Sequence, residues 1–87
     1  MPYTLYIPEH LDKILNKLSK KDKLQFEILT RKIQEILENP KIGEPLTGNM
    51  AGQRSVHIRH FVLIYEILEN ENAVKLLDYD HHDVVYR

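Results

Sequence analysis

The chain ends in the segment DHHDVVY (residues 80–86), in which two adjacent histidines stand four residues before an aromatic. Histidine is the side chain whose ordinary pKa lies closest to neutrality, so two histidines can act as one base and one acid at the same pH. Three interpretations are open: a metal site, a catalytic pair or a polar tail. The other residues of the chain provide the evidence for choosing among these three interpretations.

Four of the five histidines fall in the C-terminal part of the chain: His57, His60, His81 and His82. If three strands of this part form a meander, the end of the first strand and the end of the last meet at one edge of the sheet. His57, His60, His82 and Tyr86 should therefore converge. Cleavage of RNA by its own 2′-hydroxyl needs a base, an acid and a group that stabilises negative charge. We assign His57, His82, His60 and Tyr86 to catalysis.

Other side chains suit the binding of an RNA substrate. Arginine grips phosphate through a planar and permanently charged fork, which makes Arg54, Arg59 and Arg87 candidates. Phe61 offers a ring on which a displaced base can stack, as does Tyr86. We also assign His81 to substrate binding.

Zinc is the main competitor for the histidines, because His-x-x-His, His-His and nearby aspartates are all suitable ligand types. The spacing matches no standard metal signature, however, and His57 and His60 would point to opposite faces of a straight strand. The sequence therefore favours chemistry without a metal or another cofactor.

The elements that must position these residues can be read from periodicity. One apolar stripe has the helical spacing i, i+3, i+4, i+7, formed by Leu11, Ile14, Leu15 and Leu18. Residues 19–21 should break this helix, and Asp22 is the expected N-cap of a second helix that stops at Asn39-Pro40. Residues 41–52 read as an extended loop. Strands are expected at residues 3–7, 54–58, 61–68 and 73–79.

The predicted order is β-α-α-β-β-β, an α+β fold with a helical hairpin packed on a mostly antiparallel four-stranded sheet. Its 87 residues, 43% of them apolar, suit one domain spanning residues 1–87. The absence of cysteine, of a signal peptide and of an apolar run of roughly 20 residues predicts a cytoplasmic protein with no membrane partner. The net charge is only −1, although lysines gather between Lys13 and Lys23.

Two segments together resemble a known family. The stretch PLTGNMAGQRSVHIRHFVLIYEI (residues 45–67), followed by YDHHDVVY (residues 79–86), is similar to toxins of the RelE/ParE superfamily, and more narrowly to the YafQ-like branch of RelE mRNA interferases. The matching positions are Leu46, Gly48, Gly52, Arg54, His57, Ile58, Phe61, residues 63–65, His82 and Tyr86.

The resemblance implies a RelE-like fold and a toxin that cuts mRNA in the ribosomal A site. It assigns acid/base roles to His57 and His82, and places Phe61 and Tyr86 next to the substrate. Its partners would be the ribosome, mRNA and a cognate antitoxin that wraps around the toxin in a hetero-oligomer.

Some positions depart from the family pattern. Val62 stands where RelE toxins proper carry arginine, Ser55 and His57 where they carry lysines, Asp78 where the YafQ-like branch carries a basic residue, and His60 where that branch carries aspartate. Two alternatives therefore stay open: a ParE-like inhibitor of DNA gyrase, and an inactive relative that binds the antitoxin.

Overall fold

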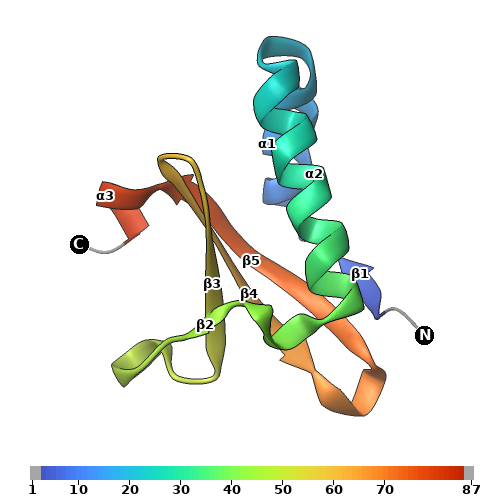
Figure 1. Cartoon of the computed structure of the whole chain (residues 1–87), viewed down its shortest axis with the longest axis vertical. Helices are drawn as coiled ribbons and strands as arrows, with labels where there is room; N and C mark the ends of the chain where they lie inside the picture. Colours follow the sequence, from blue (N-terminus) through green and yellow to red (C-terminus); the bar gives the residue numbers. More distant parts are fainter. Residues whose placement is uncertain (1–2, 86–87) are drawn as a thin grey trace.

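The computed structural model describes residues 3–85. Two long helices, α1 and α2, stand together on one side of a twisted sheet, while the short helix α3 lies away from them beside the tip of the β3–β4 hairpin (Figure 1). In chain order the elements are β1 (Thr4–Tyr6), α1 (Glu9–Lys21), α2 (Lys23–Glu38), β2 (Glu44–Pro45), β3 (Gln53–Ile58), β4 (Phe61–Leu68), β5 (Ala73–His81) and α3 (His82–Val85). Within residues 3–85, no helix is long and apolar enough to cross a membrane.

The sheet confirms the predicted architecture with one addition. Its strand order is β1-β5-β4-β3-β2, with β1 parallel to β5 and the other neighbours antiparallel. The fifth strand, β2, comes from the segment expected to be only an extended loop, and Glu44 and Pro45 pair there with Ser55 and Arg54. Proline lacks an N–H and is tolerated at the edge of a sheet, so this strand ends the sheet.

The helical hairpin differs from expectation at the end of α1. Residues 19–21 do not break the helix, which continues to Lys21. Ser19 turns its hydroxyl back onto the carbonyl of Asn16 (2.7 Å), a bond that helices tolerate. Asp22 is the N-cap of α2 as predicted, and its Oδ1 accepts a hydrogen bond from the Gln25 amide (3.1 Å).

Replacing the Asp22 cap by alanine should lower the free energy of unfolding by about 1 kcal/mol, because the Gln25 amide would lose its side-chain acceptor. Urea unfolding measures this change. Gln34→Ala, an exposed substitution within the same helix, is the matched control and should change stability by no more than about 0.5 kcal/mol. Equal stability of Asp22→Ala and wild type would contradict the capping role.

The core lies between the helical hairpin and the sheet. Alternation along β4 turns Leu63 and Tyr65 toward the helices, where they pack with residues of α1, α2 and β5. One member of the predicted stripe is not core, because 41% of Ile14 is exposed. Fully buried apolar residues of this cluster are Leu11, Leu29, Ile36, Ile58, Leu63, Tyr65, Val74 and Leu76.

Two buried tyrosines form hydrogen bonds through their hydroxyl groups inside the protein. The Tyr65 hydroxyl donates to the Pro40 carbonyl (2.6 Å) and accepts from the Gly43 amide (2.9 Å). The Tyr79 hydroxyl accepts a hydrogen bond from Nε2 of Gln25 (2.8 Å). Burial raises the pKa of both tyrosines above the ordinary value, although the hydrogen bonds from Gly43 and Gln25 act in the opposite direction.

Stability should therefore fall at alkaline pH. The unfolded chain loses these tyrosine protons near pH 10, whereas the folded state holds them to higher pH, so stability is intact below about pH 10 and is lost as pH rises further. Urea unfolding at pH 9 and pH 11 measures the loss. Tyr79→Phe should show a smaller loss than wild type. Tyr6→Phe, at a side chain that is 45% exposed, is the control and should match wild type.

Candidate active site at the tip of the β3–β4 hairpin

The candidate residues meet where three strands end. Ile58, the last residue of β3, pairs with Phe61, the first residue of β4, so Arg59 and His60 form a two-residue turn. On the other side of β4, Phe61 pairs with His81 at the end of β5. The meander therefore brings residues from two distant segments together at the end of the sheet where these three strands stop, as the sequence predicted.

His57 and His82 form the first histidine pair. Their ring centroids are 5.4 Å apart, with the planes tilted by 32°. The backbone holds this arrangement, because the amide of His82 donates to the carbonyl of His60 (2.9 Å) and so fixes the start of α3 against the turn. Both side chains are exposed, and a carboxylate oxygen of Asp83 lies 3.7 Å from Nδ1 of His82. Such a pair can reach a substrate from solvent.

His60 and His81 form a second pair. Their rings are nearly parallel (15°) with centroids 6.4 Å apart. Nδ1 of His81 accepts a long hydrogen bond from the Asp83 amide (3.4 Å) and lies 3.8 Å from its carboxylate. The predicted convergence thus takes the form of two pairs, His57 with His82 and His60 with His81. Among residues 3–85, no group of three or more histidine, aspartate or glutamate side chains is placed to hold a metal ion.

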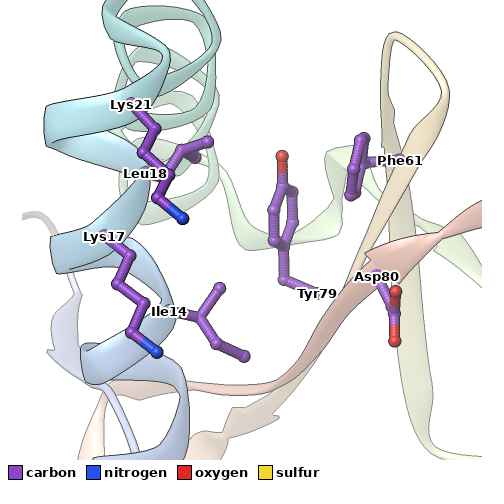
Figure 2. A pocket seen from close by; sticks show the side chains of 7 residues that line it. All are labelled: Ile14, Lys17, Leu18, Lys21, Phe61, Tyr79 and Asp80. Carbon is purple, nitrogen blue, oxygen red and sulfur yellow. The ribbon is translucent and has the colours of Figure 1, made fainter.

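Phe61 joins the histidines to an aromatic stack. Its ring lies parallel to that of Tyr79 (5.0 Å, 13°) and meets the edge of His81 at 5.7 Å. Figure 2 shows the two parallel rings on one wall of a groove, opposite the side chains of Lys17 and Lys21 on α1. This groove has a volume of about 290 Å³ and is lined by Ile14, Lys17, Leu18, Lys21, Phe61, Tyr79 and Asp80. Its α1 side thus combines the apolar side chains of Ile14 and Leu18 with the two lysines.

Of the three candidate arginines, Arg54 and Arg59 lie within the described residues, and the structure places them apart. Arg54 lies three residues before His57 on β3, roughly 10 Å along the strand. Its Nη1 donates to the carbonyls of Gly43 (2.7 Å) and Lys41 (3.2 Å), which fixes the loop before β2. Arg59 lies in the turn itself, between the residues of the two histidine pairs. Of these two, Arg59 is the one that lies at the hairpin tip.

Two predicted site residues, Tyr86 and Arg87, lie outside the described residues. Of the family departures, Val62 is fully buried between His57 and Asp80 on the neighbouring strands, and the Asp78 carboxylate accepts a hydrogen bond from the Tyr79 amide (2.9 Å). Gln25 was not predicted at all. Its side chain donates to Tyr79 and its Oε1 accepts from Arg59 (3.4 Å).

A family model and a named relative both relate this chain to toxins of toxin–antitoxin systems. The model of ParE-like toxins of type II bacterial toxin–antitoxin systems matches residues 5–87. An uncharacterised protein of Methanosarcina mazei is 47% identical over 85 residues, which is 97% of this chain and 99% of the relative. The Methanocaldococcus jannaschii protein named "Putative toxin RelE4" is 40% identical over 86 residues, covering 98% of this chain and 92% of the relative.

Solved structures share the fold at low identity. A YoeB/ParE toxin from Agrobacterium tumefaciens superposes with a TM-score of 0.80 at 20% identity, covering 91% of this chain and 98% of the other. A chain of the RelBE2 toxin–antitoxin complex of Mycobacterium tuberculosis gives a TM-score of 0.77 at 24% identity, covering 94% and 93%. A double mutant of the Escherichia coli toxin RelE in the free state gives a TM-score of 0.76 at 23% identity, covering 97% of this chain and 87% of the other.

Proposed function

Because the chain belongs to the family of ParE-like toxins of type II toxin–antitoxin systems, we propose that it is a toxin that cleaves mRNA on the ribosome, without a metal, by histidine acid/base catalysis. The observation that carries this proposal is the His57–His82 pair at 5.4 Å, assembled from two segments and exposed at one edge of the sheet. A protein that only binds a partner has no need of such a pair.

The reaction requires two proton transfers. One histidine of the pair accepts the proton of the ribose 2′-hydroxyl, whose oxygen then forms a bond to phosphorus. The bond from phosphorus to the 5′-oxygen breaks, and the other histidine protonates this leaving oxygen. The products are a 2′,3′-cyclic phosphate and a 5′-hydroxyl. The reaction therefore consumes neither water nor a cofactor.

The neighbouring residues suit the substrate. Arg59, which lies in the turn next to His60, supplies a permanent positive charge that is proposed to stabilise negative charge on the phosphate. Phe61 presents a ring held between Tyr79 and His81, on which an unpaired base can stack. His60 and His81 border the same turn, and Tyr86 is proposed to add a second stacking ring. Arg54 is proposed to act mainly on the loop that it holds.

The proposed partners follow from the same reading. An antitoxin partner is supported by structural neighbours that are toxin–antitoxin complexes, including RelBE2 of M. tuberculosis. The ribosome and mRNA are proposed as the substrate assembly, which would place the protein in the cytoplasm. The ribosome would also position the RNA, so that a chain with a net charge of −1 need not bind free RNA tightly. We place the chain in the YafQ-like branch on its closing His82-to-Tyr86 spacing.

Primer-extension mapping of an mRNA in a reconstituted translation reaction tests the proposal. Reactions with and without ribosomes, each with and without a chelator that binds zinc but spares the Mg²⁺ that ribosomes need, should give cuts that depend on ribosomes and resist the chelator. Cuts that vanish with the chelator would contradict a metal-independent reaction. An absence of cuts in every reaction would contradict the proposal that the protein is a nuclease.

The second candidate is a ParE-like inhibitor of DNA gyrase, since the matching family is described as ParE-like toxins. The same fold can serve both activities, so the fold does not separate them. Supercoiling by purified gyrase, measured with and without the protein, distinguishes the two: inhibition without RNA cuts would establish the second candidate.

A further inference from the structure

Gln25 is a polar side chain that the fold buries almost completely. Only 4% of it is exposed, and among the described residues Ser55 is the one other polar residue buried to this degree. Burying an amide is unfavourable unless its donors and acceptor find partners. The burial of Gln25 must therefore be compensated by hydrogen bonds to its side-chain amide.

Local helix chemistry does not supply these hydrogen bonds. Gln25 follows the Asp22 cap by three residues, the spacing at which a glutamine normally reaches back to the backbone amide of the cap residue. Here the Asp22 amide already donates to the carbonyl of Leu18 (2.9 Å), at the end of α1. The continuation of α1 to Lys21 thus leaves the Gln25 side chain available for contacts outside the helix.

The Gln25 side chain instead ties three elements together. Its Nε2 donates to the hydroxyl of Tyr79 on β5 (2.8 Å) and to the carbonyl of Ile58 at the end of β3 (3.3 Å). Its Oε1 accepts from Nη1 of Arg59 in the turn (3.4 Å). One amide on α2 therefore contacts the strand end, the turn and the ring that stacks on Phe61.

The turn has a backbone that needs such support. Arg59 has a φ of 61°, in the left-handed region that side chains other than glycine seldom adopt. A strained residue persists only where its surroundings hold it, and such residues gather at functional sites. Gln25 contacts this residue and the one before it.

We propose that Gln25 is a positioning residue of the RNA-cleaving site, which holds the hairpin tip so that Arg59 and His60 face the substrate phosphate. The inference rests on the proposed function. Beside the tip lies a groove of about 290 Å³, in which the proposal places part of the RNA backbone. It is lined by Leu18, Asp22, Gln25, Arg59, His60 and Phe61. Gln25 itself need not touch the RNA.

Gln25→Met tests the proposal, because methionine keeps the length of the side chain and removes all three hydrogen bonds. Cleavage should lose about 10–100-fold in kcat, the effect of a small misplacement of catalytic groups. Amide exchange at residues 58–61, measured without RNA, should speed up by about tenfold or more as the tip loosens. Gln34→Met, the same change at an exposed site of α2, is the control and should leave both measurements unchanged.

Gln25→Glu adds a readout that a loss of stability would not produce. Protonated glutamic acid has one O–H donor and one carbonyl acceptor, whereas ionised glutamate only accepts. The activity of Gln25→Glu relative to wild type should therefore rise as pH is lowered, while the corresponding ratio for Gln25→Met should not.

The outcomes separate this inference from the proposed function. Unchanged exchange at residues 58–61 in Gln25→Met would overturn the positioning role, whatever the cleavage rate. Faster exchange with normal cleavage would show that the contact is structural only and would also overturn it. A wild-type protein that cuts no RNA would overturn the proposed function, and the substrate role of the tip with it, even if exchange responded as expected.

Discussion

His82→Ala and His57→Ala should each reduce ribosome-dependent mRNA cleavage by at least about 100-fold, and both should relieve growth inhibition on expression in cells. Each change removes one of the two groups proposed to exchange protons with the ribose hydroxyl and the leaving oxygen. The two ring centroids lie 5.4 Å apart, so the proposed reaction depends on both imidazoles. Primer extension with purified variants measures the loss.

Both variants should stay folded, because His57 and His82 are exposed and neither belongs to the hydrophobic core. His10→Ala is the matched control, since His10 is an exposed histidine at the start of α1 and should leave cleavage unchanged. The pH–rate profile adds a second test: loss of the base should remove one limb of a bell-shaped profile and loss of the acid the other. Full growth inhibition by His82→Ala would refute the catalytic assignment.

Gly43→Ala should lower the free energy of unfolding by about 1–3 kcal/mol, a large effect for the addition of one methyl group. A Cβ at this position would overlap the hydroxyl and ring of Tyr65, a side chain with no exposed surface. Tyr65 cannot retreat without giving up its hydrogen bonds to Pro40 and Gly43. Urea unfolding measures the loss, and Glu44→Ala at the exposed neighbour is the control.

Tyr65→Phe should also cost about 1–3 kcal/mol, because the Gly43 amide and the Pro40 carbonyl lose a partner inside the protein. Both changes break the same Gly43–Tyr65 hydrogen bond, so the double variant should be less destabilised than the sum of the two. Strict additivity would show that the two residues act independently. The pair thus links the loop before β2 to the central strand.

The elements that carry the site follow from local patterns in the sequence. The patterns that predicted strands at 54–58, 61–68 and 73–79 also predicted that they form a meander, and with it the approach of His57 to His82. Asp22 could be recognised as a cap because capping depends on three neighbouring residues. The family could be recognised because its glycines, arginine and histidines occur at fixed spacing along the chain.

Other features depend on contacts between segments that no local pattern records. The pairing of Glu44 and Pro45 with β3 is an edge contact of two residues, too short to have a period. The separation of the histidines into two pairs depends on the twist and register of three strands.

Gln25 shows the difference most clearly. It stands three residues after the Asp22 cap, where a glutamine normally bonds the backbone amide of the cap residue. The extension of α1 satisfies that amide instead, and the fold brings Ile58, Arg59 and Tyr79 within reach of the Gln25 side chain. The sequence by itself determined which residues can do acid/base chemistry and which strands carry them, since both are properties of residue types and short spacings. Only the tertiary structure decided which side chain holds the hairpin tip, because a buried hydrogen bond forms wherever packing brings donor and acceptor together.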